Sequence, residues 1–116
     1  MWRPRWSARI GDISAAIGAV AHAAGYGIPA GFGGHGIGRR MHEDPHVPND
    51  GRPGRGMRLR QGLVLAVEPM VMAGGGDDFK LAPDGWALHT VDGSRAAHAE
   101  HTVAVTDSGP RILTLP

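Results

Sequence analysis

A single apolar stripe at helical spacing, followed by a long chain that glycine and proline interrupt repeatedly, limits the possible folds most. The stripe consists of Ile13, Ile17, Val20 and Ala24. Its intervals of three and four residues predict one helix over residues 13–24, with the apolar face in the core. Asp12 stands at the N-cap position of this helix, and Gly25 stands where a helix-ending glycine belongs.

Beyond this helix, frequent turn residues predict short antiparallel strands. Residues 28–62 are rich in Gly, Pro, Asn, Asp and Arg, which predicts irregular backbone and, at this length, a functional loop. Four strands are expected, at residues 63–72, 86–90, 96–106 and 111–115. Asp84-Gly85 and Asp92-Gly93 are hairpin-type turn signals. The sequence therefore predicts an α/β (α+β) fold with one N-terminal helix and a mostly antiparallel sheet, as one modest domain or part of a larger one.

Composition excludes several functional classes. The chain has 12 Lys and Arg against 11 Asp and Glu, so its charge gives no reason to expect a nucleic-acid or anionic-membrane partner. It has no Cys, which excludes disulfides, thiolate metal sites and cysteine nucleophiles. No apolar run approaches the ~20 residues that span a bilayer. No apolar segment follows the basic start, so we expect a cytoplasmic protein without a secretory signal.

Three side chains that bind metals well occupy unusual positions. His35 lies among the glycines of residues 33–38, where bulk is forbidden. Glu68 and Glu100 lie within predicted strands, where a carboxylate is costly unless it is paired or binds a cation. One imidazole with two carboxylates suits Mn, Fe, Co or Zn and two-metal hydrolysis. The pattern alone leaves open a satisfied loop histidine, a water-facing edge-strand glutamate, and an ion pair of Glu100 with an arginine.

Several strings together resemble one enzyme family. They are Gly-His-Gly-Ile-Gly-Arg at 34–39, Met-His-Glu at 41–43, Val-Pro-Asn at 47–49, Val-Glu-Pro-Met at 67–70, Asp-Gly-Trp at 84–86 and Glu-His-Thr-Val at 100–103. Their content, order and spacing resemble methionine aminopeptidases of metallopeptidase family M24, over residues 10–116. The aminopeptidase P and prolidase group shares the His and Glu placements. The last two strings favour the methionine enzymes, and the lack of room for a long helical insertion favours their type I form.

This resemblance implies a fold and a function. The fold is the pita-bread fold, in which two pseudo-symmetric halves enclose a dinuclear metal site. Residues 10–116 would form the C-terminal half of the catalytic domain, a partial pita-bread fold with a mostly antiparallel curved sheet. The implied activity is metal-dependent removal of the N-terminal methionine from nascent polypeptides. The implied cofactors are two divalent ions per complete site, chosen among Co, Mn, Fe and Zn.

The resemblance also implies roles for individual residues. His35, Glu68 and Glu100 match metal ligands; Glu68 also matches the general acid/base, and Glu100 the ligand that bridges both ions. His42 matches a histidine that contacts the substrate peptide bond and stabilises its developing charge.

Two further residues match positions beside the methionine side chain. They are Met41 and Trp86, and a thioether suits an apolar, polarizable pocket. Both are therefore predicted to bind the substrate.

The sequence also departs from the family pattern, and each departure predicts a change in the site. Two aspartate ligands and an earlier catalytic histidine are not found in this sequence, because Asp12 is the one aspartate before His35 and has been assigned to the helix cap. His98 stands where many relatives carry Gln, and Ala99 replaces a usual aromatic; both changes would alter support of the ligands. We expect a truncated or frameshifted gene, or a misplaced start.

The lead-in and the absent half leave further alternatives. Residues 1–9 match no pattern and are expected to be an unstructured lead-in, with a basic arm as the alternative. The rival to an enzyme is an inactive remnant or a non-catalytic peptide-binding module on the same scaffold. Residues 63–72 are apolar on both faces apart from Glu68, as in a central buried strand. We therefore expect aggregation, a molten state, or self-association through the surface that the other half would cover.

Overall fold

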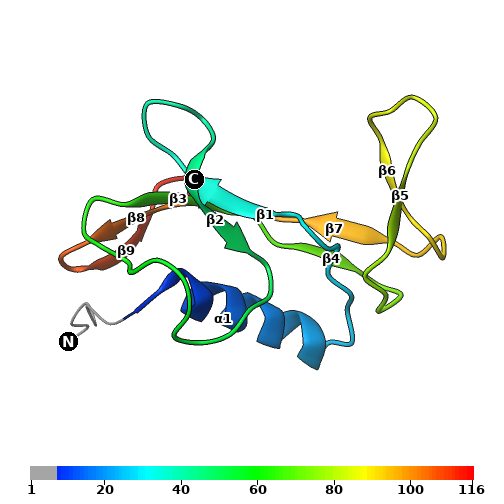
Figure 1. Cartoon of the computed structure of the whole chain (residues 1–116), viewed down its shortest axis with the longest axis horizontal. Helices are drawn as coiled ribbons and strands as arrows, with labels where there is room; N and C mark the ends of the chain where they lie inside the picture. Colours follow the sequence, from blue (N-terminus) through cyan, green and yellow to red (C-terminus); the bar gives the residue numbers. More distant parts are fainter. Residues whose placement is uncertain (1–7) are drawn as a thin grey trace.

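The computed structural model describes residues 8–116, which form one helix and nine strands (Figure 1). The elements are α1 at Ile10–Ala23, β1 at Gly33–Gly36, β2 at Glu43–Pro48, β3 at Val64–Val67, β4 at Met70–Met72, β5 at Phe79–Leu81, β6 at Leu88–Thr90, β7 at Ala96–His98, β8 at His101–Thr106 and β9 at Gly109–Ile112. Strands β2, β1, β3, β8 and β9 form a sheet in that order, while β4 pairs with β7 and β5 with β6. Every pairing is antiparallel, which confirms the predicted class.

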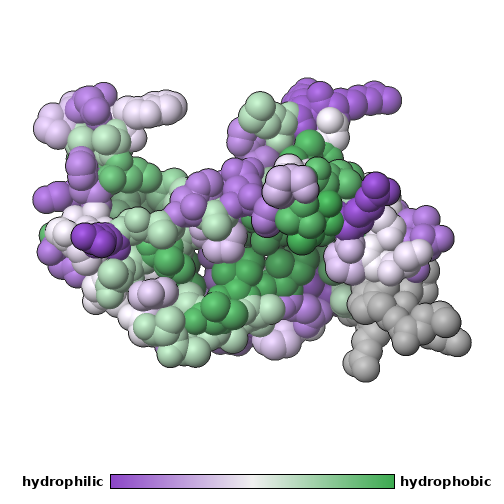
Figure 2. All heavy atoms as spheres, turned by 180° about the vertical axis from the view of Figure 1, so that it is seen from behind, coloured by the Kyte–Doolittle hydropathy of each residue, from purple (hydrophilic) through white to green (hydrophobic). Residues whose placement is uncertain are grey.

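The helix lies on one side of the five-stranded sheet, and two projections rise on the other side of the molecule. In Figure 1, α1 lies below the sheet, the β1–β2 loop rises above it, and the β5–β6 hairpin rises at the right, beyond β4 and β7. Figure 2 shows these projections from behind, separated by a hollow. The molecule therefore has an open side opposite the helix.

The helix begins earlier than the apolar stripe predicted. Its first residue is Ile10 and its N-cap is Arg9, so the assignment of Asp12 as the cap was wrong. Asp12 instead accepts hydrogen bonds from the N–H groups of Arg9 at 2.7 Å and Gly54 at 2.9 Å. These bonds to the ionised carboxylate hold the pKa of Asp12 below its ordinary value. The predicted end is confirmed, because Gly25 follows the C-cap with a φ of +74°.

The buried face of α1 also differs from the predicted one. The buried helix residues are Ile10, Gly11, Ser14, Gly18 and Ala21. Val20 is 74% exposed, although it belonged to the predicted core stripe. Close backbone contact explains the difference: a Cβ on Gly11 would lie 2.3 Å from the carbonyl oxygen of Arg52. The helix approaches the segment after β2 through its small residues, and hydrophobic periodicity does not register such a face.

Two predicted strands are each divided between separate sheets. Residues 63–72 break at Glu68-Pro69 into β3 and β4, because Pro69 has no N–H to donate to a ladder. Residues 96–106 break at residues 99–100 into β7 and β8. The part that remains as β3 is central, between β1 and β8, and Leu65 and Ala66 are buried. Predicted strands 86–90 and 111–115 shift to β6 and β9.

The loop predicted at 28–62 contains two paired strands, so the prediction of wholly irregular backbone was wrong. The glycines of β1 make this pairing possible. A Cβ on Gly34 would lie 2.0 Å from the carbonyl oxygen of Ala66, and one on Gly36 would lie 2.1 Å from that of Asp44. Strand β1 therefore fits between β2 and β3 because it lacks side chains at these positions. The glycine run, which predicted a loop, is instead what a strand needs when its neighbours approach this closely.

We predict that Gly34→Ala destabilises the sheet and displaces His35. The added methyl group must push β1 and β3 apart, which costs about 1–3 kcal/mol of unfolding free energy. Urea unfolding followed by circular dichroism measures this loss. Gly76→Ala is the matched control, because no heavy atom lies within 4 Å of its Cβ position. Equal stability of the two variants would contradict the role of crowding at Gly34.

The core is small for a chain of this length. The buried hydrophobic residues are Ile10, Ala21, Ile28, Val47, Leu65, Ala66 and Met72. The radius of gyration is 15.1 Å, against about 13 Å for a compact domain of this size. Large apolar side chains remain exposed, including Leu81 at 58% and Trp86 at 87%. Much apolar surface is therefore in contact with solvent.

The predicted lead-in is only partly within the described residues. Residues 1–7 lie outside them. Ala8 and Arg9 pair with the chain that precedes β3. The Leu59 N–H donates to the Ala8 carbonyl at 2.8 Å, and the backbone of Arg9 forms an isolated β-bridge with that of Arg58. The prediction of an unstructured segment was therefore wrong for these two residues. Within residues 8–116, the one helix is too short to cross a bilayer.

Candidate metal centre

Three candidate ligands come from three neighbouring strands and meet at one point. His35 lies in β1, Glu68 directly follows β3, and Glu100 directly precedes β8. Ala66 lies opposite both His35 in the β1–β3 ladder and Thr102 in the β3–β8 ladder. The same β3–β8 register, continued past its last pair, sets Glu68 opposite Glu100. The donor atoms of the three side chains lie within 4.8 Å of one another.

This arrangement brings two carboxylates together across a sheet. Like charges opposite each other destabilise paired strands. No arginine or lysine forms an ion pair with Glu68 or Glu100 in residues 8–116, where the imidazoles of His35 and His98 lie 3.3 and 3.2 Å from the Glu68 carboxylate. A divalent cation between the carboxylates would remove the repulsion, so the donor set fits a metal of the kind expected from the sequence.

The imidazole of His35 is oriented as a nitrogen ligand. Its Nδ1 lies 2.9 Å from the carbonyl oxygen of Gly36, which can only accept, so Nδ1 carries the proton. Nε2 is then the nitrogen left to bind a cation, and it lies 3.3 Å from Glu68 Oε1. Two donors bound to one cation at ~2.0–2.2 Å stand about 3–3.5 Å apart. The observed separation therefore matches a shared cation.

Glu68 is held by two groups that the sequence alone did not assign. Its backbone carbonyl accepts a hydrogen bond from Nδ2 of Asn49 at 3.1 Å, and Asn49 is 1% exposed. Its Oε2 accepts one from Nε2 of His98 at 3.2 Å. Asn49 was noted only as part of a motif, and His98 as a departure from the family pattern that would alter support of the ligands, without a named partner. Neither position had a periodicity or spacing signal that pointed to Glu68.

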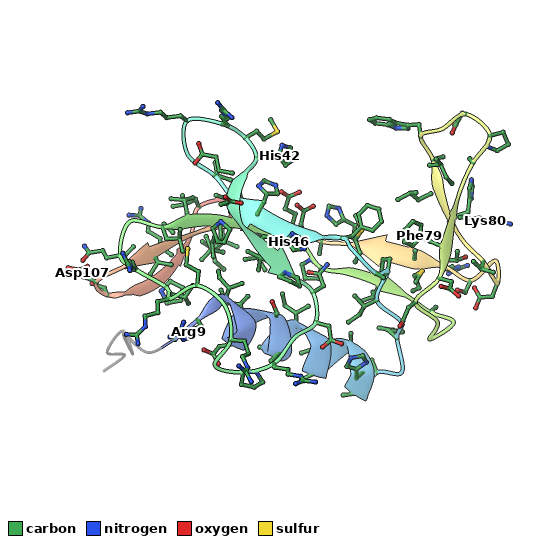
Figure 3. The ribbon with its side chains drawn as sticks, in the orientation of Figure 1. Arg9, His42, His46, Phe79, Lys80 and Asp107 are labelled. Atoms are coloured by element: carbon green, nitrogen blue, oxygen red, sulfur yellow. The ribbon has the colours of Figure 1, made fainter. Side chains whose placement is uncertain are left out.

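His42 lies beside the three ligands without joining them. Its ring centroid is 4.2 Å from that of His35, with the planes tilted by 42°. Figure 3 shows His42 at the base of the β1–β2 loop, on the open side of the sheet. Its ring is exposed, so a molecule entering the open side would meet His42 directly.

An apolar pocket of about 230 Å³ adjoins this site. It is lined by Pro29, Phe32, Met70, Val71, Met72, Phe79, Leu88, His89, Thr90, Ala96, Ala97 and His98. The rings of Phe32 and Phe79 meet edge to face, with centroids 5.1 Å apart. Through His98, the pocket wall is connected to Glu68.

The two predicted substrate residues stand apart from this pocket. Met41 is 74% exposed on the β1–β2 loop, and Trp86 is 87% exposed near the tip of the β5–β6 hairpin. Neither lines the pocket. Their role as substrate contacts stays a prediction.

Comparison with known proteins places this geometry in a family. Residues 2–107 match the model of metallopeptidase family M24. Methionine aminopeptidase 1 of Mycobacterium tuberculosis is 56% identical over an alignment of 113 residues, and the match covers 92% of this chain and 42% of that protein. Methionine aminopeptidase of Clostridium acetobutylicum is 53% identical over 107 residues, with the same two coverages. The chain thus spans about 42% of the length of these curated relatives.

Solved structures agree with this assignment. Methionine aminopeptidase from Thermotoga maritima superposes with a TM-score of 0.90 at 45% identity, over 100% of this chain and 45% of that one. The enzyme from Rickettsia prowazekii gives a TM-score of 0.89 at 43% identity, over 97% and 45%. The superpositions confirm the expected partial pita-bread fold. Their strength over nearly the whole chain, together with the family match, shows that this chain belongs to metallopeptidase family M24 and resembles its methionine aminopeptidases.

Proposed function

We propose that this chain is the cation-binding part of a methionine aminopeptidase, which removes the N-terminal methionine from nascent polypeptides in the cytoplasm. The observation that carries the proposal is the convergence of His35, Glu68 and Glu100 from three separate strands. The relatives named above support the reaction and the substrate. Two neighbouring carboxylates that no arginine or lysine in the described part of the chain neutralises repel each other, and a cation bound between them would remove that repulsion.

The three residues would hold a divalent ion of the Mn, Fe, Co or Zn type. When bound, such an ion supplies Lewis-acid polarisation and lowers the pKa of a coordinated water. In this proposal a complete site would hold two ions, and Glu100 would be a ligand to both. The described residues bring together one group of three donors, so the second ion requires further ligands.

The protein's own groups would move protons and stabilise charge. Glu68 acts as general acid/base: its carboxylate accepts the proton of the attacking water and returns it to the departing amine. His42, exposed on the open side and beside His35, would donate a hydrogen bond to the peptide carbonyl as negative charge develops there.

The apolar pocket would take the methionine side chain. It adjoins Glu68 through His98, and its lining includes Met70 and two aromatic rings, which suit a polarizable thioether. Met41 and Trp86 project from the two structures that flank the open side, the β1–β2 loop and the β5–β6 hairpin (Figure 1). In this proposal they contact the substrate once it occupies the open side.

Titration of the 116-residue chain with Co²⁺ tests the proposal. We expect Co²⁺ to bind at one tight site. Each of His35→Ala, Glu68→Gln and Glu100→Gln is expected to lower the Co²⁺ affinity more than about 100-fold, which exceeds the loss caused by changing a residue that only supports a ligand. His22→Gln is the control, because His22 lies in α1 and pairs with Asp50 rather than with any of the three ligands. Unchanged affinity in all three ligand variants would show that the convergence has no role in metal binding. A chain that binds peptides but no cation would favour the alternative, a non-catalytic peptide-binding module.

A further inference from the structure

We propose that His98 is a positioning residue, which fixes the Glu68 carboxylate in the orientation required for cation binding. The inference rests on the proposed function, in which Glu68 is a cation ligand. Its starting observation is one carboxylate between two imidazoles. His35 Nε2 lies 3.3 Å from Oε1, and His98 Nε2 lies 3.2 Å from Oε2.

The fold holds His98 at this position through the ribbon of β4 and β7. His98 ends β7 and lies opposite Met70, the first residue of β4. The next N–H group, that of Ala99, donates to the carbonyl of Pro69 at 3.1 Å. The chain on both sides of the His98 side chain is therefore tied to the residues that directly follow Glu68. A change in the Glu68 backbone would displace His98 with it.

The two imidazoles differ in which nitrogen carries the proton. In His35 the Gly36 carbonyl takes the Nδ1–H, which leaves Nε2 free to bind a cation. In His98 it is Nε2 that faces Glu68 within hydrogen-bond geometry, and an ionised carboxylate only accepts. His98 Nε2 therefore carries a proton and donates it to Oε2. His35 is arranged as a ligand, and His98 as a donor to a ligand.

The hydrogen bond from His98 restricts the side chain of Glu68, which is otherwise flexible. Binding a cation requires Glu68 to give up its side-chain rotamer freedom, which opposes binding. The hydrogen bond to Oε2 selects one orientation in advance and leaves Oε1 directed at His35. Donors of this kind raise metal affinity by orienting the ligands. The sheet fixes the Glu68 backbone, and His98 fixes its carboxylate.

The experiment measures Co²⁺ binding by the full 116-residue chain with two substitutions at one position. His98→Ala removes the donor and is expected to lower Co²⁺ affinity about 10- to 100-fold. His98→Gln keeps an N–H donor without an imidazole, so its affinity is expected to stay within about threefold of that of the unsubstituted chain. His22→Gln, in α1 and paired with Asp50, is expected to leave the affinity unchanged.

A spectroscopic signature separates positioning from ligation. In proton NMR of the Co²⁺-loaded chain, each coordinated imidazole gives a strongly shifted N–H signal. One such signal, from His35, is expected in the unsubstituted chain and in both His98 variants. If the unsubstituted chain instead gives two such signals, and His98→Gln loses one of them together with Co²⁺ affinity, His98 is a ligand and the proposal is overturned.

The ligand variants separate failure of this inference from failure of the proposed function. If Glu68→Gln abolishes Co²⁺ binding while His98→Ala binds as tightly as the unsubstituted chain, the role of His98 is wrong and the cation site stands. If the unsubstituted chain binds no Co²⁺, or Glu68→Gln has no effect, both are overturned. Equal affinity losses in His98→Ala and His98→Gln would also overturn positioning by hydrogen bonding.

Discussion

The 116-residue chain, supplied with Co²⁺ or Mn²⁺, is expected to release methionine from a Met-Gly peptide no faster than its own Glu68→Ala variant. Two-metal hydrolysis needs both ions held at fixed geometry. The described residues assemble one group of three donors, His35, Glu68 and Glu100. We therefore expect the chain to lack the rate enhancement of a complete enzyme, which is on the order of 10⁶-fold or more.

The measurement is free methionine released over hours, by a mass-based assay that detects single turnovers. A complete methionine aminopeptidase of the same family, assayed with the same ions, is the positive control. The Glu68→Ala comparison removes any contaminating aminopeptidase from the result. Methionine release by the unsubstituted chain that Glu68→Ala abolishes would refute the prediction and show that residues 1–116 form a working site.

The second large effect is expected in folding: the chain alone should unfold with less than half of the enthalpy of a well-packed domain. A packed domain of the described length absorbs roughly 75 kcal/mol near 60 °C. Here the core is small, and large apolar side chains such as Leu81 and Trp86 are exposed. Apolar surface that stays exposed in the folded chain adds neither to the enthalpy of unfolding nor to the cooperativity of the transition. We also expect concentration-dependent self-association, because exposed apolar patches associate.

Scanning calorimetry and sedimentation velocity over a wide range of protein concentration test this expectation. Replacing Leu81 and Trp86 with serine should weaken self-association, whereas Gly76→Ala should not. Mixing the chain with the N-terminal half of a close relative should increase the unfolding enthalpy; a second copy of the chain is the alternative partner. A sharp cooperative transition from a strictly monomeric sample would count against the prediction.

The sequence predicted which three side chains converge better than it predicted the scaffold that holds them. His35, Glu68 and Glu100 were identified from their strings, and the structure brings them together although each is more than thirty residues from the next. Their roles as ligands remain predictions. The strand break at Glu68-Pro69 has a local cause, the proline. Residues 63–72 were nevertheless predicted to form one strand, because apolar residues continue on both sides of the break.

Other features could not be obtained from local patterns. The helix face was assigned wrongly because Gly11 and Gly18 allow backbone contact that hydropathy does not describe. The contacts of Asn49 and His98 with Glu68 span 19 and 30 residues of chain. Such contacts follow from how three sheets are placed, and no single-sequence periodicity encodes that placement.

The way the three ligands are distributed among strands has a consequence for the order of folding. Each donor belongs to a different strand or strand end, so a binding site exists only after β1, β3 and β8 have paired across long loops. Long-range pairings form late, because their loop-closure entropy precedes any gain. Visible absorbance of bound Co²⁺ would then appear only in the last kinetic phase of refolding. The ion would report the pairing of β1, β3 and β8 and would not guide nucleation of the sheet.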